Sequence, residues 1–295
     1  MKSAPQYFSR YVRAGLYKMH YVEWGDGTPV VMIHGGGPGA AGEFGWRNNI
    51  PAISRHGRAI AIDQIGFGLS DKPLDREYNH QFLVEQFARF IDALCLDEIY
   101  IVGNSLGAYV AARYALDHPG RVKKMLLVSS GTVGTGMGIE SGMTPRAGMT
   151  EGMKSLVSYD GTKEGLRRFI QGIMYHPENF DDEKLAKRFE YAELPGVKEA
   201  QASFMNFFQK RRLEDPEAAQ WFDIRHRLPK LTIPLLFIWG SHDIFALPAV
   251  AEQMQTMLPN ATFEFFKESG HLVQNDEPEH FNRVAVKFFF GVDEA

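Results

Sequence analysis

Six short apolar segments alternate with helix-like patterns along this chain, and this alternation limits the possible folds more than any other feature of the sequence. Such runs are typical of strands that are buried on both faces of a sheet. The segments are residues 30–33, 59–62, 99–102, 125–128, 235–239 and 262–266. The clearest helical pattern between them carries its apolar residues on one face, at Leu83, Phe87, Phe90, Ile91 and Leu94. The alternation predicts an α/β fold, with a mostly parallel central sheet flanked by helices.

The strand pattern is interrupted between the fourth and fifth of these segments. A stretch rich in glycine and methionine, residues 131–149, leads there into several helix-like patterns. These patterns lie near residues 165–174, 182–194 and 197–212. We therefore predict a core formed by residues 1–130 and 229–295, with residues 131–228 inserted as a helical lid over the strand ends. The alternative is that the glycines mark only a flexible loop.

The composition is that of a globular protein that acts on a small molecule. The 295 residues are 44% hydrophobic, and the net charge of −4 gives no basic field for a nucleic acid partner. Cys95 is the only cysteine, which excludes an internal disulfide and a thiolate-rich metal site. The histidines form no metal-binding motif, so we infer no metal and no cofactor.

The sequence has no apolar stretch that approaches the roughly 18 residues of a membrane span, and its first residues lack the apolar region of a signal peptide. We therefore expect a cytoplasmic protein without a membrane partner. Whether the chain forms a homo-oligomer stays open at this point.

The pentapeptide Gly103-Asn104-Ser105-Leu106-Gly107 lies between a strand pattern and an alanine-rich helical pattern. This is the context of a G-x-S-x-G nucleophile elbow. The sharp turn forces the serine into a strained backbone conformation, and small residues two positions away avoid a clash. The serine hydroxyl then lies at a helix N-terminus, where developing negative charge is favoured. The alternative for Ser105 is an ordinary helix-capping residue.

A serine nucleophile needs a base and an acid, and in this type of fold the chain order is Ser, acid, His. Asp243 comes just after the strand pattern of residues 235–239, and His271 comes just after the next one. Parallel strands end at the same edge of a sheet, so we predict that Ser105, Asp243 and His271 meet there as catalytic residues. The alternatives are that Asp243 caps a helix and that His271 is a solvated loop residue.

The glycine-rich stretch at residues 34–39 has two interpretations. The segment 37–42 matches the dinucleotide-binding pattern G-x-G-x-x-G, and Asp63 stands further on as a candidate acidic residue for the ribose. That interpretation requires a long helix that starts within the motif. Residues 43–57 contain two asparagines and a proline and have poor helical periodicity. We therefore assign Asp63 to a turn after its strand.

The second interpretation gives these glycines a role beside the serine. An oxyanion hole uses the N–H of the residue after the nucleophile and another N–H from the loop that follows an earlier strand. Leu106 supplies the first of these groups, and Gly36 or Gly37 supplies the second. Glycine at these positions allows the backbone to approach a reacting carbonyl closely.

Five of these motifs together resemble the α/β-hydrolase superfamily, and the resemblance covers nearly the whole chain. The motifs are "HGGGPG", "DQIGFGLSDKP", "VGNSLGA", "WGSHD" and "SGH". Within the superfamily, "HGGGPGA" with "GNS" is similar to the meta-cleavage product hydrolases. That family cleaves a carbon–carbon bond in 2-hydroxy-6-oxohexa-2,4-dienoates, which are ring-opened products of aromatic degradation.

The resemblance implies further site residues. Family members bind the substrate carboxylate with an arginine, and Arg188 in "KLAKRFEYA" matches that position. Asn104 matches a polar family residue that contacts the dienolate. Leu272 stands where many members have a tryptophan, and Gly45 where many have an asparagine. From its position after His271, we expect Leu272 to line the pocket that holds the acyl portion of the substrate.

Three functions are weighed on these residues. The first is C–C bond hydrolysis of a dienoate through Ser105, His271 and Asp243. The second is hydrolysis of an ester, lactone or amide by the same three residues. The third is a non-catalytic ligand receptor built on a hydrolase fold. Retention of all three side chains argues against the receptor, because simple binding has no use for them.

Overall fold

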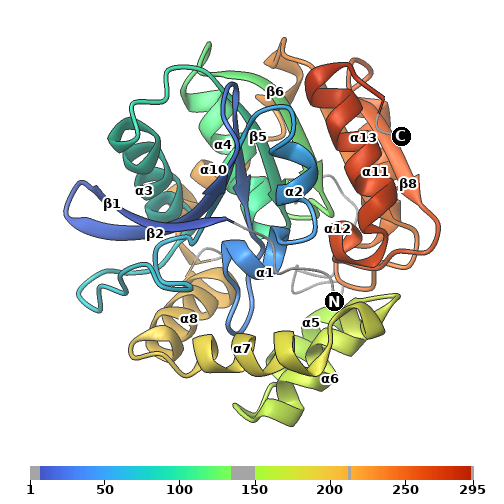
Figure 1. Cartoon of the computed structure of the whole chain (residues 1–295). Helices are drawn as coiled ribbons and strands as arrows, with labels where there is room; N and C mark the ends of the chain where they lie inside the picture. Colours follow the sequence, from blue (N-terminus) through green and yellow to red (C-terminus); the bar gives the residue numbers. More distant parts are fainter. Residues whose placement is uncertain (1–6, 134–149, 212–213, 294–295) are drawn as a thin grey trace.

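An eight-stranded sheet forms the centre of the molecule (Figure 1). The structure is a computed structural model, and it describes residues 7–133, 150–211 and 214–293. The strand order is β1-β2-β4-β3-β5-β6-β7-β8. The β1–β2 and β2–β4 pairs are antiparallel, and the other neighbouring pairs are parallel. The strands are β1 (Phe8–Ala14), β2 (Tyr17–Trp24), β3 (Pro29–Ile33), β4 (Arg58–Ile62), β5 (Ile99–Asn104), β6 (Val122–Val128), β7 (Leu235–Gly240) and β8 (Thr262–Phe266).

All six strands predicted from the sequence are present, as β3 to β8, and the prediction of an α/β fold is confirmed. The β1–β2 hairpin was not predicted. β1 lies at the edge of the sheet, and most of its side chains are exposed, so its sequence carries no apolar run. An edge strand of this kind gives no periodic signal that separates it from a loop.

Side chains alternate between the two faces of the sheet, and each face has its own apolar cluster. In β3, Val31 and Ile33 belong to the cluster that includes residues of α3 (His80–Ala93), α4 (Leu106–Asp117) and α11 (Pro248–Met257). Val30 and Met32 belong to the opposite cluster, with residues of α2 (Ile50–Ile53) and α13 (Pro278–Phe290). A central strand that is covered on both faces must be apolar at every position, which explains the continuous apolar runs.

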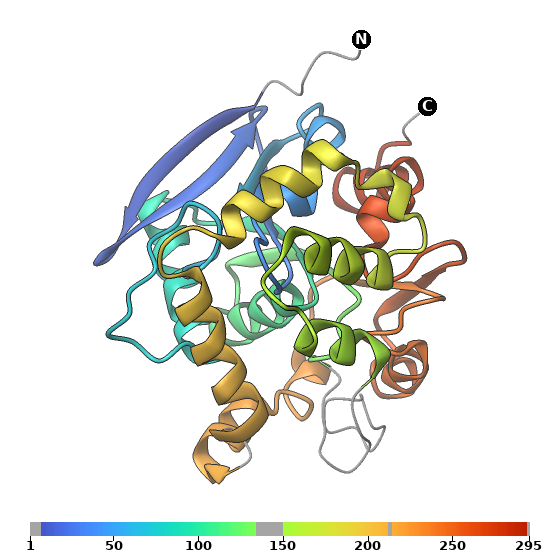
Figure 2. The same cartoon turned by 90° about the horizontal axis from the view of Figure 1, so that it is seen from below.

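The segment between β6 and β7 contains the remaining long helices. These are α5 (Glu151–Val157), α6 (Lys163–Ile173), α7 (Asp182–Ala192), α8 (Val197–Asn206) and α10 (Pro216–Phe222), with a π-helix at Phe207–Arg211 and 3-10 turns at Pro177–Asn179 and Leu228–Lys230. We call residues 150–228 the helical insertion. Figure 1 shows α5 to α8 below the carboxyl ends of the parallel strands, and Figure 2, seen from below, shows them across that end of the sheet.

The three helical patterns predicted within the insertion correspond to α6, α7 and α8. Most of the glycine- and methionine-rich stretch, residues 134–149, lies outside the described residues. The exact bounds of a lid domain therefore stay a prediction. Within the described ranges, none of the helices has the length and apolar character needed to cross a membrane.

Candidate active site

Ser105 lies at a strained turn between β5 and α4. Its backbone has φ 54° and ψ −114°, in a region that non-glycine residues rarely adopt. The two flanking glycines leave no space for a side chain. A Cβ added at Gly103 would lie 2.3 Å from the carbonyl oxygen of Gly107, and a Cβ added at Gly107 would lie 2.3 Å from the carbonyl oxygen of Ile33. Ser105 occupies the N-cap position, but its side chain makes no capping hydrogen bond. The hydroxyl is therefore available for another role.

Asp243 and His271 are in hydrogen-bond contact. His271 Nδ1 lies 2.9 Å from Asp243 Oδ2, and both residues are almost fully buried, with 5% and 2% of their surface exposed. Asp243 Oδ1 accepts the backbone N–H groups of Phe245 and Ala246, each at 2.8 Å. Helix α11 has Leu247 as its N-cap, so Asp243 is not the cap of that helix. Burial likewise argues against a solvated loop role for His271.

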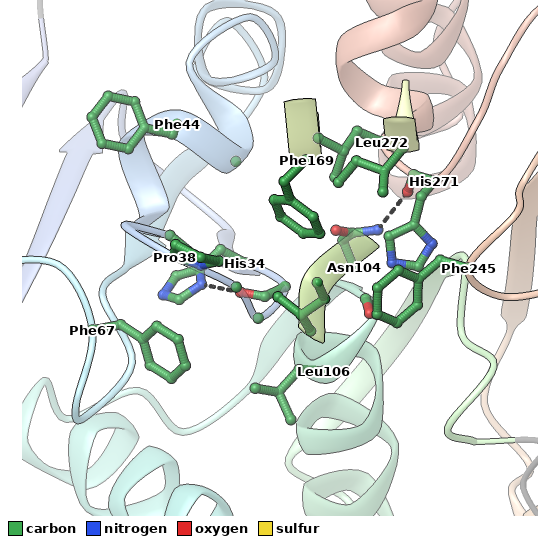
Figure 3. Close-up of a pocket in the computed structure, with 18 of the residues that line it drawn as sticks. His34, Pro38, Phe44, Phe67, Asn104, Leu106, Phe169, Phe245, His271 and Leu272 are labelled. Carbon is green, nitrogen blue, oxygen red and sulfur yellow. Dashed lines mark hydrogen bonds between the residues drawn. The ribbon is translucent and has the colours of Figure 1, made fainter. Parts of the chain in front are cut away.

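One pocket is lined by Ser105 and His271 together with the predicted oxyanion-hole and substrate-binding residues. Figure 3 shows His271, Asn104, Leu106 and Leu272 around it. Among the described residues, no hydrogen bond joins the Ser105 hydroxyl to His271, although both side chains face this pocket. Such contacts are often long without substrate and shorten when it binds. Phe245 stacks on the His271 ring with centroids 4.8 Å apart, and it shields the imidazole from one side.

The glycine loop after β3 lies against the elbow. An added Cβ at Gly35 would lie 3.3 Å from the Ser105 Cβ, and one at Gly36 would lie 3.6 Å from the Leu106 side chain. Gly37 has φ +102°, and an added Cβ there would lie 3.6 Å from Arg188 Nη2. Leu106 is the first residue of α4, so the helix itself cannot pair its N–H. The loop thus lies directly beside the turn of Ser105 and the first residue of α4.

The dinucleotide-binding interpretation of residues 37–42 is wrong, because no long helix follows the glycine motif. Two short helices, α1 (Gly42–Trp46) and α2, stand where one long helix would be needed. Asp63 is buried and organises the turn after β4, since its carboxylate accepts the backbone N–H groups of Gly42 at 2.7 Å and Leu69 at 2.8 Å. The assignment of Asp63 to a turn is therefore confirmed.

Arg188 projects from α7 into the pocket and is 5% exposed. Its Nε donates to the Pro38 carbonyl at 2.9 Å, and its guanidinium carbon lies 5.8 Å from the centre of the Phe180 ring. No carboxylate of the described chain lies within ion-pairing distance of it. Burial lowers the pKa of Arg188 to about 10, although Tyr159 opposes this shift, so the side chain is still charged at neutral pH. A buried cation without an acid is a site that favours an anion.

Known proteins share the fold of this chain. The family model for the alpha/beta hydrolase fold matches residues 28–278 of this chain. The chain belongs to the α/β-hydrolase family. In this hydrolase, Ser105, Asp243 and His271 lie in the segments that follow β5, β7 and β8.

The relatives of this hydrolase include several meta-cleavage product hydrolases. The 2-hydroxy-6-oxo-6-(2'-aminophenyl)hexa-2,4-dienoic acid hydrolase of Metapseudomonas resinovorans is 29% identical over 97% of this chain and 92% of its own length. A 2-hydroxy-6-oxononadienedioate/2-hydroxy-6-oxononatrienedioate hydrolase of Burkholderia vietnamiensis is 31% identical over 92% of this chain and 90% of its own. The solved meta-cleavage product hydrolase from Pseudomonas fluorescens is 28% identical, with a TM-score of 0.79 over 95% of this chain and 97% of its own.

Asn104 and Leu272 both line the pocket of the hydrolase. The Asn104 side-chain amide donates to the His271 carbonyl at 3.2 Å (Figure 3), and so it ties the elbow to the loop that carries the histidine. Leu272 packs beside Phe169 of α6 in an apolar cluster of the insertion. At Gly45, an added Cβ would lie 3.1 Å from the His34 Cβ, so a larger residue there would require His34 to move.

Three further pocket residues of the hydrolase make contacts that the sequence did not predict. His34 is buried, its Nδ1 donates to the Gly35 carbonyl at 2.6 Å, and its Nε2 accepts the Gln64 N–H at 3.1 Å. Burial lowers the pKa of His34, which keeps the ring neutral in this arrangement. Gln201 of α8 donates to the Gly37 carbonyl at 3.2 Å. The position of Phe245, two residues after Asp243, was the only available sequence signal for its stacking on His271.

Proposed function

We propose that this α/β-hydrolase cleaves the C5–C6 bond of a 2-hydroxy-6-oxohexa-2,4-dienoate, with Ser105, His271 and Asp243 as its catalytic residues. The observation that carries the proposal is the buried guanidinium of Arg188 in the pocket of Ser105 and His271, which has no carboxylate partner among the described residues. An ester hydrolase for neutral substrates has no use for this charge, whereas a dienoate carboxylate would neutralise it. The names of the relatives support the same substrate class.

The reaction starts with a proton transfer by His271. Asp243 accepts the Nδ1 hydrogen, which leaves the Nε2 lone pair directed into the pocket. Nε2 takes the proton of the substrate 2-hydroxyl, and the proton is returned at C5, so that the dienol becomes a 2,6-diketone. This step separates the C6 carbonyl from the conjugated system and prepares it for attack.

Bond cleavage follows through an acyl-enzyme. The Ser105 oxygen forms a bond to C6 as its proton passes to His271 Nε2. The C5–C6 bond then breaks, its electron pair moves toward the 2-oxo group, and the proton on His271 completes the 2-hydroxypentadienoate product. Water, deprotonated by His271, hydrolyses the acyl-serine and restores the enzyme.

Backbone N–H groups stabilise the negative charge on the C6 oxygen during both halves of the reaction. We assign this role to Leu106 together with Gly36 or Gly37, because the glycine loop lies against the elbow. Gln201 and Arg188 each donate to a carbonyl of this loop, at Gly37 and Pro38, so the insertion holds the loop in position.

A substrate panel tests the proposal. The enzyme is mixed with dienoates that carry a methyl, branched alkyl or phenyl group at C6, and separately with p-nitrophenyl acetate. We expect rapid loss of the dienoate colour, formation of 2-hydroxypentadienoate, and a kcat/KM well above that for the ester. Turnover of the ester with every dienoate left intact would favour ester hydrolysis and contradict the proposal.

A further inference from the structure

Three side chains on β1, on β2 and just after β4 form the series of contacts that can activate a serine. Ser9 Oγ lies 2.8 Å from His20 Nε2, and His20 Nδ1 lies 2.8 Å from Asp63 Oδ2. A hydroxyl, an imidazole and a carboxylate are thus joined in series, as the diagnostic arrangement of an activated nucleophile requires. All three residues lie outside the pocket that contains Ser105.

The topology of the sheet edge produces this arrangement. β1 and β2 form an antiparallel hairpin in which Tyr11 is opposite His20 and Ser9 is opposite Val22 (Figure 1). Ser9 and Tyr11 lie two residues apart and so face the same side of the hairpin as His20. β2 pairs in turn with β4, and Asp63 follows directly after β4. The Asp63 N–H donates to the His20 carbonyl at 2.9 Å, which fixes the two residues side by side.

The surroundings of Asp63 determine the tautomer of His20. The Asp63 carboxylate accepts the N–H groups of Gly42 and Leu69, so it acts as a fixed acceptor. When its ring is neutral, His20 therefore donates through Nδ1 and accepts through Nε2. The Ser9 hydroxyl then donates its hydrogen to Nε2, which is the direction in which general-base activation moves the proton.

The base and the acid of this series are buried, whereas the serine is exposed, as a reactive serine requires. His20 is 3% exposed and Asp63 is 1% exposed, whereas Ser9 is exposed on the edge strand. The Tyr11 ring lies beside the His20 ring, with centroids 5.0 Å apart, and it restricts motion of the imidazole. A reagent in solution can therefore reach the hydroxyl while the base and its orienting acid stay ordered.

We propose that Ser9, His20 and Asp63 form a second activated-serine site, at which activated aryl esters acylate Ser9 independently of Ser105. The Ser9 oxygen forms a bond to the acyl carbon as its proton moves to His20 Nε2. The bond between the acyl carbon and the aryl oxygen breaks, and the aryloxide leaves with the electron pair. The proton passes from His20 to the leaving group or to solvent, and an ester of Ser9 is the product.

The test uses the full-length Ser105→Ala variant, in which the pocket serine cannot react. The protein is treated with p-nitrophenyl acetate, nitrophenolate release is followed by absorbance, and acetylated peptides are mapped by mass spectrometry. The matched control is Ser158, an exposed serine whose hydroxyl donates only to the Ser155 carbonyl. We expect acetylation of Ser9 to be at least about tenfold faster than that of Ser158, since a positioned base contributes roughly 10²- to 10⁴-fold in enzymes.

Two further variants separate a reactive serine from one that only holds β1 in place. In the Ser105→Ala background, Ser9→Ala should remove the acetyl label at residue 9. It should also remove the part of the nitrophenolate release that comes from acetylation of Ser9. His20→Asn keeps a donor for Asp63 and removes the base, so labelling of Ser9 should fall to the rate at Ser158. The Ser9→Ala change alone should leave dienoate hydrolysis intact.

The proposal is overturned if Ser9 and Ser158 are acetylated at equal rates, or if nitrophenolate release is the same with and without Ser9. Fast labelling of Ser9 that persists in folded His20→Asn protein would also overturn it. If His20→Asn does not fold, the comparison of Ser9 with Ser158 in the Ser105→Ala protein, with His20 intact, decides the question by itself.

Discussion

At the scale of single residues, Arg188 combines a functional role with a cost in stability. A buried charge without a counterion opposes folding, and its replacement by an apolar residue of similar size is often neutral or stabilising, by up to about 4 kcal/mol. We therefore expect Arg188→Met to unfold at equal or higher urea concentration than the wild type. The same variant should lose roughly 10- to 150-fold in kcat/KM for dienoates, because it lacks a charge-assisted contact worth about 1.5 to 3 kcal/mol.

Neutral esters provide the internal comparison for this prediction, because they have no carboxylate for Arg188 to bind. Lys187→Met is the matched control, since Lys187 lies on the same helix and its side chain is half exposed. Equal losses on esters and dienoates, or a loss of stability in Arg188→Met beyond that in Lys187→Met, would contradict the anion-binding role.

The elbow makes a prediction that concerns the backbone of Ser105. Both Ser105→Ala and Ser105→Gly should abolish turnover, because neither has a nucleophile. The backbone of residue 105 has φ 54°. Alanine at this φ has a steric cost of order 1 to 3 kcal/mol, as serine does, whereas glycine adopts it without that cost. The Gly variant should therefore have the higher free energy of unfolding, by about 1 kcal/mol, in denaturant titrations. Equal stabilities would show that the turn stores no strain at this residue.

Leu272 allows a test of substrate selection beside the histidine. It lines the pocket next to Phe169, so Leu272→Trp would fill space with a flat ring. We expect the variant to change the relative kcat/KM values among methyl, branched alkyl and phenyl dienoates, since one methylene in such a pocket is worth about 1 to 3 kcal/mol. A uniform change across the three substrates would exclude Leu272 from the acyl pocket.

The sequence was informative at those residues where a motif and a strand end coincide. Ser105, Asp243 and His271 each follow a recognisable strand, so their convergence could be predicted from topology alone. The contacts of Gln201 and Phe245 depend on the angle at which a helix or a loop crosses the pocket. No local pattern specifies that angle, which is why these two residues were missed.

At the scale of elements, the buried carboxylate of Asp276 joins the insertion to the loop that carries His271, because it accepts a backbone N–H from each. Asp276 of α12 (Val273–Asp276) accepts the N–H of His176 through Oδ1 and the N–H of Gly270 through Oδ2, each at 2.8 Å. His271 itself donates its N–H to the Ile173 carbonyl at 2.8 Å. Loss of Asp276 should therefore loosen the histidine as well as the insertion.

Asp276 also gives a dependence of stability on pH. Burial raises the pKa of its carboxyl above the ordinary 3.8, against the hydrogen bonds that lower it. The folded state thus binds the proton more tightly than the unfolded chain does, and this stabilisation is present below the ordinary pKa and is lost as the pH rises through the raised pKa. The free energy of unfolding of the wild type, relative to Asp276→Asn, should fall over that acidic interval.

The measurement is a set of urea titrations at several acidic pH values on both proteins. Asp26→Asn, at an exposed position, controls for the loss of one negative charge. A wild-type advantage over Asp276→Asn that grows with pH would mean that the hydrogen bonds outweigh burial, and would reverse the assigned direction.

Strands and helices differ in how well the sequence predicts them. The buried strands and the helices with one apolar face were predicted because burial imposes a period on the side chains. β1 was not predicted because Arg10 and Arg13 interrupt its apolar residues. Val12 and Ala14 reach the core at one end, and the rest of the strand is held by its partner β2. Pairing between strands leaves little trace in the composition of an edge strand.

At the scale of the whole molecule, stability depends on covering both faces of the sheet. Phe281 of α13 is buried against Trp46, with ring centroids 6.1 Å apart, in the cluster opposite α3 and α4. We expect Phe281→Ala to cost about 3 to 5 kcal/mol in the free energy of unfolding, because it leaves a cavity between α13 and the sheet. Urea titration measures the loss. Leu74→Ala, at a residue 63% exposed, should change it by about 0.5 kcal/mol or less.

The alternation of strands and helices was enough to predict the sheet and its flanking layers. It did not reveal which parts of the insertion reach the pocket, because that depends on contacts between segments far apart in the chain. Arg188 and Pro38 are an example, since they are 150 residues apart and meet through one hydrogen bond.

The hydrogen bond from His271 to Ile173 has a consequence for protein engineering. A designer who transplants residues 150–228 from a relative, in order to import its substrate range, also replaces the carbonyl that holds the backbone of the proposed catalytic base. In chimeras of this kind, a change in substrate preference could not be separated from a change in the reactivity of His271. A graft that retains the end of α6 through Asn179, and exchanges only α7 and α8, would alter the walls of the pocket and leave the histidine on its native support.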